Sequence, residues 1–233
     1  MMKSSLLSQH GYRILQNVIP RMVVISYHMH MNNNELRPTV WRTARALANK
    51  NRLLLLREVW MAKGSLSVTD LSRRVGMAVP TASQYLRAMN ARGLISVGRN
   101  ASYVYYADGK DRSLPEAQAI QDALSSLFSR KRLPVDWTQP VLSLLRAYSH
   151  FRRIDIIRSL ASCGNAGFND ISRNTSIPKM SLARHLKVLL SAQVVARDVG
   201  GGYSLCKPQD EVASALLGVT VHGSLEGIAF CKM

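Results

Sequence analysis

Polar and basic side chains recur at matching positions in two segments that lie 100 residues apart. In each segment they alternate with an apolar stripe of helical spacing, formed in the first by Ala82, Leu86 and Met89. On the outer face of such a helix, the Gln84 amide could pair with adenine and the Arg184 guanidinium with guanine. The predicted DNA-contacting residues of the two helices are Thr81, Ser83, Gln84, Arg87, Lys179, Ser181, Arg184 and Lys187.

The two segments differ in the turns that follow them. The first has Arg99 in a predicted turn over residues 98–102. A contact to a DNA phosphate and an ordinary solvated charge explain an arginine there equally well. The second has a glycine run over residues 200–202 and the more basic helix. Because two unequal copies do not suit a symmetric site, we expect an asymmetric DNA target, or one copy that serves mainly to attach to the DNA backbone. Tyr85 and His185 occupy one equivalent position, for which local packing is the favoured role.

The charge balance favours an anionic partner. Lys and Arg number 31 against 14 Asp and Glu, a formal net charge of +17, in a chain that is 47% hydrophobic and therefore globular. Nucleic acid is preferred to a membrane surface, and no apolar run approaches the roughly 20 residues of a membrane helix. Three scattered cysteines, Cys163, Cys206 and Cys231, fit a reducing compartment. We expect a cytoplasmic protein.

Nothing in the sequence indicates catalysis. It has no phosphate-cradling glycine loop, nucleophile motif or paired-carboxylate spacing, and its six histidines show no metal-ligand spacing. The sequence therefore predicts a protein that is not an enzyme, with no cofactor and no metal site.

The elements around the first segment follow one another closely. Apolar periodicity predicts helices over 36–49, 52–61, 70–75 and 80–92, then strands over 94–97 and 103–106 and a closing helix over 113–130. Thr69 is the expected N-cap of the third helix, Gly76 ends that helix, and Gly93 is the expected C-cap of the fourth. Three helices followed by a two-stranded hairpin form a winged helix-turn-helix.

The same unit returns after a shift of 100 residues. Identities include Arg52 with Arg152 and Asp70 with Asp170, and the second closing helix would span 208–217. A tandem duplication accounts for this, with domains 36–132 and 133–233 after a basic arm or mis-assigned start over 1–35. The fold class is mainly α with small β-hairpin wings. Trp41 and Trp137 occupy equivalent positions and should pack where the copies meet; a ligand pocket that they line is the less favoured alternative.

The segments ALANKNRLLLLR (46–57), VTDLSRRVGMAVPTASQYLRAMNARGLISV (68–97) and YVYY (103–106) resemble the arsenic-repressor (ArsR-like) winged-helix family. In the second copy, RHLKVLLSAQVV (184–195) is similar to the family's recognition-helix tail. The resemblance implies a transcriptional repressor whose first and last helices form the dimer interface. The two copies would then pair within one chain as a pseudo-dimer, and a homodimer of two chains is the other arrangement open to it.

One part of the family pattern is missing. Metal-sensing members have two cysteines where this chain has Ser67 and Thr69 in the first copy and Gly167 and Asn169 in the second. Hydroxyls and amides do not replace thiolates as ligands of soft metal ions. The resemblance therefore does not extend to metal sensing.

Three functions compete. The first is a sequence-specific regulator of transcription, most simply a repressor, that reads two half-sites of double-stranded DNA with one recognition helix per copy. The second is a plasmid- or phage-type replication initiator that binds direct repeats. The third is a tandem winged-helix scaffold for protein partners, which would not need a basic helix face.

Overall fold

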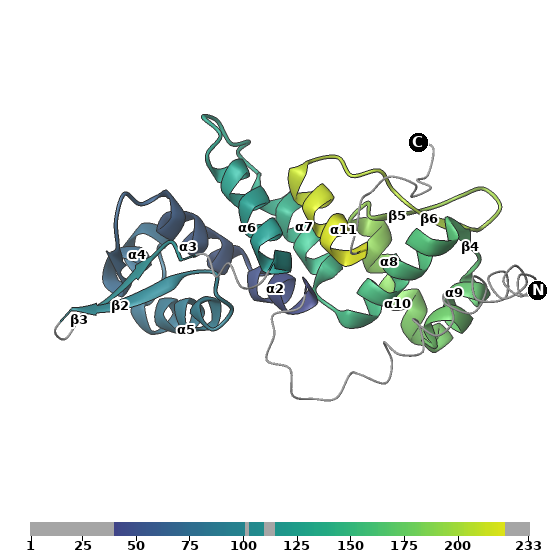
Figure 1. The fold of residues 1–233 in the computed structure, drawn as a ribbon, viewed down its shortest axis with the longest axis horizontal. Coiled ribbons are helices and arrows are strands. Elements are labelled where there is room, and N and C mark those ends of the chain that lie inside the picture. The colour runs from purple at the N-terminus through teal and green to yellow at the C-terminus, as the bar shows by residue number, and fades with distance from the viewer. Residues whose placement is uncertain (1–39, 101–102, 110–114, 222–233) are drawn as a thin grey trace, which may run out of the picture. The chain divides into compact units, whose positions relative to one another are not determined.

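Two successive runs of helices and short strands make up the described chain. The computed structural model describes residues 40–100, 103–109 and 115–221. The first half comprises α2 (Val40–Leu47), α3 (Lys50–Met61), β1 (Leu66–Ser67), α4 (Val68–Val75), α5 (Val79–Asn90), β2 (Ser96–Asn100), β3 (Tyr103–Ala107) and α6 (Pro115–Phe128). The second half comprises α7 (Thr138–Tyr148), α8 (Phe151–Cys163), β4 (Asn165–Ala166), α9 (Phe168–Thr175), α10 (Lys179–Ser191), β5 (Val195–Arg197), β6 (Tyr203–Leu205) and α11 (Glu211–Val221). Both halves thus have one element order (Figure 1).

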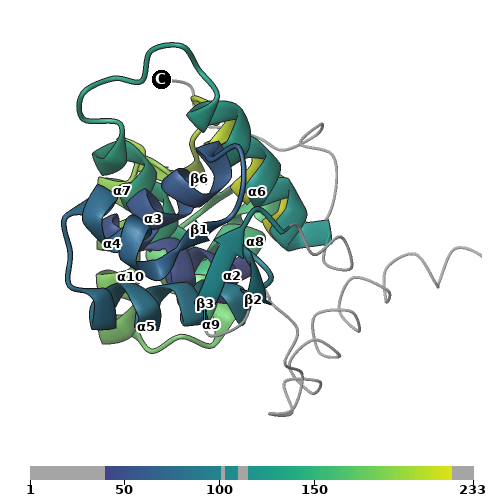
Figure 2. The same ribbon diagram turned by 90° about the vertical axis from the view of Figure 1, so that its left-hand side faces the viewer.

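Each half contains a small antiparallel sheet with its last strand in the middle. The strand orders are β1-β3-β2 and β4-β6-β5. In the first sheet Leu66 lies opposite Tyr106, and in the second Ala166 lies opposite Tyr203. Figure 2 faces the first half, in which α3 and α4 contact β3. The strands β1 and β4 were not predicted, because two residues are too few to show an alternating pattern.

The apolar stripes predicted for the recognition helices are confirmed. Ala82, Leu86 and Met89 on α5 are fully buried, and Leu182, Leu186 and Leu189 take the same positions on α10. These side chains hold each helix against the core of its half, so the opposite face is left to solvent. Since the stripes repeat every three or four residues, both helices keep one face outward along their whole length.

The boundary between the first two helices differs from the prediction. The Asn49 side chain accepts hydrogen bonds from the backbone N–H groups of Asn51 and Arg52 at 3.0 and 3.1 Å. It is therefore the N-cap of α3, which begins at Lys50 rather than at Arg52. The predicted first helix, 36–49, correspondingly ends at Leu47, and its first four residues lie outside the described part of the chain.

Two further caps were misassigned. The N-cap of α4 is Ser67 and not Thr69, because the Ser67 hydroxyl accepts the Asp70 N–H at 3.1 Å and donates to the Asp70 carboxylate at 2.6 Å. Helix α5 ends at Asn90 with Ala91 as its cap, whereas Gly93 lies in the turn beyond it with φ of 66°. Gly76 does end α4 in the left-handed conformation, as predicted.

The strands of the first hairpin are longer than expected. Strand β2 runs from Ser96 to Asn100, so Gly98 and Arg99, predicted to lie in the turn, pair in the ladder with Tyr105 and Val104. The closing helices also shift: α6 spans 115–128 instead of 113–130, and α11 spans 211–221 instead of 208–217. The predicted cap at Ser113, the arm 1–35 and Cys231 lie outside the described residues.

The two halves contact each other through their first and last helices. Helix α2 packs against α7, and α6 packs against α11. Trp41 of α2 meets Phe151 edge-on with ring centroids 6.4 Å apart, and Trp137 meets Phe128 of α6 at 5.3 Å. The Ser126 hydroxyl adds a hydrogen bond of 2.6 Å to Glu211. Both tryptophans therefore lie where the halves meet, as predicted.

None of the helices in the described residues is long and apolar enough to cross a membrane.

Candidate nucleic-acid interface

The recognition helices α5 and α10 begin without a capping side chain. The residues before them are Ala78 and Pro178, neither of which forms a side-chain hydrogen bond to the first turn. Helices α3, α4 and α8 are capped by Asn49, Ser67 and His150, whereas α7 and α9 also begin without a capping side chain. The first-turn N–H groups of α5 and α10 thus keep their hydrogen-bonding capacity, which suits a phosphate oxygen.

The outer face of α5 is polar and largely accessible. Gln84 and Arg87 are exposed, while Thr81 and Ser83 are half-buried. None of the four forms a hydrogen bond to another described residue, so their donors and acceptors stay available. Thr81, Gln84 and Arg87 are spaced by three residues and share the face opposite Leu86, which is the arrangement that a helix in the major groove requires.

The outer face of α10 is more strongly basic. Lys179, Arg184 and Lys187 are all exposed and form no ion pair within the described chain. Met180 stands among them with 76% of its surface exposed. This face offers three cations and one apolar side chain, a combination that can bind phosphates, guanine edges and thymine methyl groups.

Ser181 differs from the other predicted contacts, because its hydroxyl is already engaged within the protein. It accepts a hydrogen bond of 3.0 Å from the Arg152 guanidinium and lies 3.3 Å from His185 Nε2. The His185 ring in turn lies 4.6 Å from the ring of His150, the N-cap of α8. The Ser181 hydroxyl thus links α10 to the start of α8. It can contact DNA only if it shares or breaks its hydrogen bond with Arg152.

Both imidazoles of this cluster are held neutral. Burial lowers the pKa of His185 to about 4, with smaller contributions from His150, Arg153 and Arg152. Burial likewise lowers the pKa of His150, reinforced by Arg153, Arg152 and Arg45. A neutral His185 brings no charge toward a phosphate, and its ring contacts fit the packing role favoured for it.

In the first half, an arginine of the second helix contacts the recognition helix through a ring instead of a hydroxyl. Arg52 lies over the Tyr85 ring, its guanidinium carbon 5.4 Å from the ring centroid. Burial lowers the pKa of Arg52, opposed by Tyr85 and reinforced by Arg45. Arg52 and Arg152 therefore each reach from the second helix of their half to the recognition helix, a positioning role that the sequence analysis missed. Their identity at an offset of 100 is not a structural equivalence, because Arg52 is the third residue after the N-cap of α3 and Arg152 the second after that of α8.

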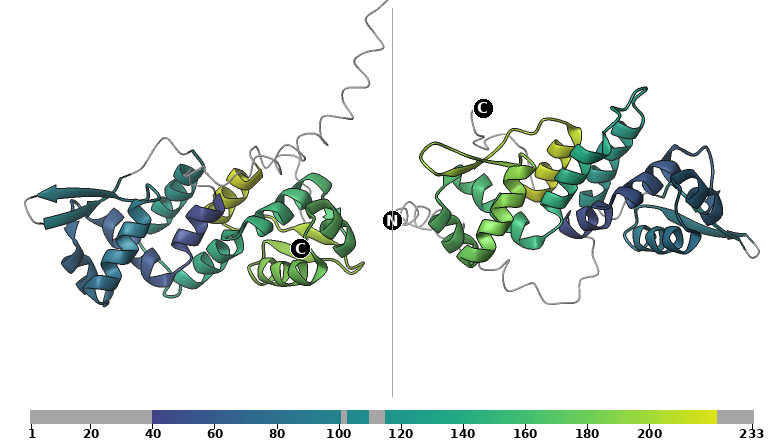
Figure 3. Two further views of the ribbon diagram at one scale, coloured as in Figure 1. Left: turned by 90° about the horizontal axis from the view of Figure 1, so that it is seen from below. Right: turned by 180° about the vertical axis from the view of Figure 1, so that it is seen from behind.

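The two hairpins differ in length and in charge. Figure 3 shows the strands of the first hairpin as long arrows. Five residues of β2 pair there with five of β3, and Arg99 is exposed on β2. In the second, only three pairs form between β5 and β6. Its turn contains Asp198, whose carboxylate accepts hydrogen bonds from Asn165 at 2.6 Å and from the Gly202 N–H at 2.8 Å.

These hydrogen bonds keep Asp198 ionised. The Asn165 amide lowers the pKa of Asp198 most, followed by the Gly202 backbone N–H. The tip of the second hairpin therefore carries a negative charge, and its backbone N–H groups are turned toward that charge. Arg197, the nearest cation, lies over the Tyr203 ring at 5.6 Å. Only the first hairpin offers an unopposed cation to a phosphate.

Known proteins share the helix-turn-helix part of this chain. The family of bacterial regulatory proteins described as the arsR family matches residues 49–97. The nodulation protein NolR of Rhizobium meliloti is 34% identical over 77 residues, which are 33% of this chain and 62% of NolR. The biofilm growth-associated repressor of Xylella fastidiosa is 30% identical over 104 residues, 43% of this chain and 84% of the repressor.

Among solved structures, reduced HlyU from Vibrio cholerae N16961 aligns over 50% of this chain and 98% of its own. The sequence identity is 22% and the TM-score is 0.30, too low for this likeness to support an argument. The alignment to the Xylella repressor, by contrast, covers most of a relative and includes the segment that the family pattern matches. The chain therefore belongs to the arsR family of bacterial regulatory proteins.

Proposed function

We propose that the protein is a sequence-specific regulator of transcription, acting as a repressor, that binds double-stranded DNA with α5 and α10. The observation that carries the proposal is that α5 and α10 each bury an apolar stripe and expose a polar or basic face on the opposite side. Membership of a regulatory family and a relative named as a repressor support it.

In the proposed arrangement the two halves form a pseudo-dimer within one chain, and each reads one half-site. Supporting this are the shared element order of the halves and the packing of α2 on α7 and of α6 on α11. Half-sites read by such a pair would lie about one helical turn, roughly 10 base pairs, apart. The half that contains α5 also has the longer hairpin, which includes Arg99. The protected tract of DNA should therefore extend further beyond the half-site that this half reads.

The contacts divide into two classes. Gln84 and Arg184 are proposed to read base edges, while Arg87, Lys179, Lys187 and Arg99 neutralise phosphates. Ser181 is proposed to position α10 through Arg152, with contact to DNA through its remaining lone pair. The half-buried Thr81 and Ser83 complete the face of α5.

Footprinting on DNA upstream of the gene tests this function, combined with anisotropy titrations of a labelled site at several salt concentrations. The double variant Arg184→Ala/Lys187→Ala should abolish the discrete footprint. Its matched control is Lys131→Ala/Arg132→Ala, which removes the same charge from exposed residues between the two halves. The control should retain the footprint.

Each alternative gives a different result. Half-sites in direct rather than inverted orientation would favour a replication initiator. Equal effects of the two double variants, with diffuse protection at low salt, would mean that net charge acts without base readout. Unchanged biological activity of Arg184→Ala/Lys187→Ala would favour a protein-binding scaffold.

A further inference from the structure

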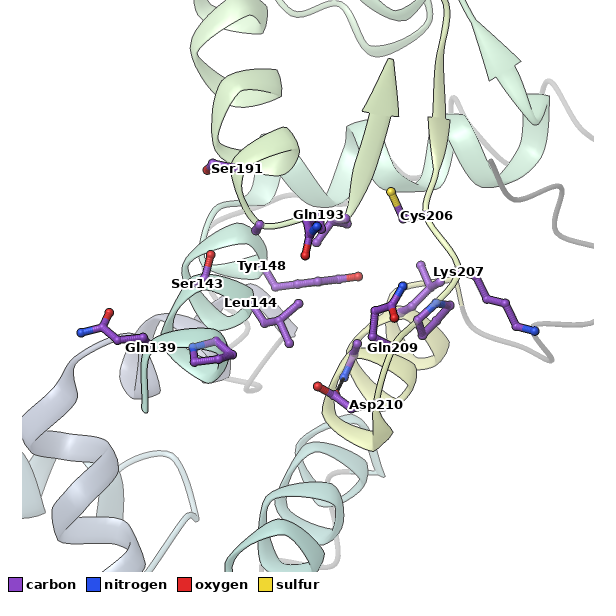
Figure 4. A pocket seen from close by; sticks show the side chains of 16 residues that line it. Gln139, Ser143, Leu144, Tyr148, Ser191, Gln193, Cys206, Lys207, Gln209 and Asp210 are labelled. Atoms are coloured by element: carbon purple, nitrogen blue, oxygen red, sulfur yellow. Dashed lines mark hydrogen bonds between the residues drawn. The ribbon is translucent and has the colours of Figure 1, made fainter. Parts of the chain in front are cut away.

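A pocket of about 470 Å³ lies in the second half, away from the proposed DNA-contacting faces. Its walls come from α7, the end of α10 with the turn after it, the segment after β6, and α11. Figure 4 shows the Tyr148 hydroxyl directed into this space, with the Gln193 amide nearby. The volume is within the range of small-molecule sites.

The Tyr148 hydroxyl has no partner among the described residues. The side chain is only 2% exposed, and no hydrogen bond joins it to the described chain. The hydroxyl oxygen is not among the buried polar atoms that lack a partner in the described chain, so it is open to the pocket and can bond there to water or to a ligand. Burial raises the pKa of Tyr148, so the phenol stays protonated and offers a hydrogen bond into the pocket.

Gln193 is a second unusual residue in the same wall. Its φ is 54°, in the left-handed region that side chains other than glycine rarely adopt. The first half places Gly93, with φ of 66°, at the equivalent turn. It also has Leu47 at the position equivalent to Tyr148, two residues before the N-cap of the next helix. The repeated fold can therefore be built without either polar group, which indicates that the second half retains both for another purpose.

The remaining walls limit the chemistry of a ligand. Leu144, Val194, Pro208, Ala213 and Leu217 supply apolar surface, and polar side chains line the rest, among them Gln139, Ser143, Ser191 and Gln209. The Lys207 side chain points away from the pocket in Figure 4, and the Asp210 carboxylate accepts the Ala213 N–H at 2.8 Å as a helix cap. No cation is therefore aimed at the buried hydroxyl to pair with an anionic ligand. A carbonyl oxygen suits a phenol donor and an amide without bringing charge.

We infer that this pocket binds a small neutral molecule with an apolar body and one carbonyl-type acceptor, held by Tyr148 and Gln193. At roughly 30 Å³ for each water-sized atom, the space holds on the order of ten to fifteen non-hydrogen atoms. The ligand would touch α7, which packs on α2, and the turn that ends the recognition helix α10. Binding there therefore changes how α10 is held relative to α7.

The binding test uses the full chain and three neutral carbonyl probes: acetanilide, coumarin and caprolactam. Saturation-transfer NMR and calorimetry should detect at least one at millimolar concentration or below, and benzoate should bind at least tenfold more weakly. Tyr148→Phe should weaken binding about 3- to 10-fold, the net effect of one hydrogen bond. Tyr203→Phe, which removes a tyrosine hydroxyl outside the pocket lining, should leave binding unchanged.

Thermal unfolding without any probe gives an independent readout. Because the Tyr148 hydroxyl is open to the pocket and forms no hydrogen bond to the described chain, Tyr148→Phe should leave the melting temperature within about 2 °C of the natural chain. A fall of more than about 4 °C would show that the hydroxyl has a structural partner. Probes that do not bind up to 10 mM, or that bind Tyr148→Phe equally well, would overturn the proposed site.

A regulatory effect of the ligand rests on the proposed DNA-binding function, and its measurement is separate. The probe that binds should change the affinity of the full chain for its footprinted site, and Tyr148→Phe should reduce that change. Binding without an effect on DNA affinity keeps the ligand site and removes its regulatory role. Failure to bind any DNA would overturn the function proposed above while leaving the NMR result intact.

Discussion

At the scale of single residues, Gln193 shows how the two halves have diverged at one backbone position. A left-handed conformation costs a residue with a side chain about 1–2 kcal/mol, and glycine has no such cost. Glycine also has more conformational freedom in the unfolded chain, which reduces the stability gained by removing the strain by about 0.4–1 kcal/mol. We expect Gln193→Gly to be about 1 kcal/mol more stable than Gln193→Ala in urea denaturation, since both variants lose the amide. Equal stabilities would mean that the turn leaves the left-handed region.

His185 gives the protein a dependence of stability on mild acid. Its folded-state pKa of about 4 is below the ordinary 6.5, so the unfolded chain binds the proton more readily. The contribution of His185 is therefore fully present above pH 6.5 and is lost as the pH falls from 6.5 toward 4. The lowered pKa of His150 acts in the same direction. We expect a lower free energy of unfolding at pH 5 than at pH 7.5.

His185→Tyr separates this effect from other titrations, because the first half already has Tyr85 beside an arginine of its second helix. The loss of stability between pH 7.5 and pH 5 should be smaller in this variant than in the natural chain, and measurements at or above pH 5 leave most carboxylates ionised. An unchanged loss would assign the pH dependence to His150 or to groups elsewhere.

The exposed positions proposed to contact DNA were predictable, and the interactions of their neighbours were not. Helical periodicity alone identified the outward positions Gln84, Arg87 and Arg184, because it depends only on local spacing. The engagement of Ser181 depends on Arg152, which reaches it from 29 residues earlier in the chain. No local pattern carries such information. The same holds for Tyr148, whose hydroxyl lacks a partner only because of how four distant segments meet.

At the scale of elements, the longer helices followed from the sequence and their ends did not. Apolar stripes that span three turns identify a helix reliably, whereas a cap depends on the rotamer of one side chain. Ser67 and Thr69 are both suitable N-caps, and the Ser67–Asp70 bonds decide between them. The hairpin turn was misjudged because glycine usually marks a turn, while Gly98 lies within a ladder pair with Tyr105.

The hairpins should contribute unequally to DNA binding. Arg99 is exposed on the longer hairpin, whereas Arg197 lies over Tyr203 next to the ionised Asp198. We expect Arg99→Ala to weaken binding and to reduce the slope of log affinity against log salt by about 1. Arg197→Ala, which removes the same charge from the other hairpin, should change neither. Equal slopes for the two variants would contradict the proposed role of the first hairpin.

At the scale of the whole molecule, the unequal halves share one buried junction. Phe128 is 1% exposed and lies against Trp60 of its own half and Trp137 at the start of the other. Truncating such a ring costs about 3–5 kcal/mol, so Phe128→Ala should lower the free energy of unfolding in urea by about that amount. In the proposed arrangement, this junction would fix the spacing between α5 and α10, which two separately folded domains on a flexible linker could not do.

The proposed pairing within one chain makes a definite prediction for stoichiometry. If α2, α7, α6 and α11 already form the interface, one chain should bind one operator. Light scattering of the complex after gel filtration should then give a single chain per duplex, and the binding curve should show a Hill coefficient near one. Two chains per duplex, with affinity that falls steeply on dilution, would mean that a second interface exists between chains. In that case each half-site would be read by a separate molecule, and the asymmetry between α5 and α10 would lie within each half-site.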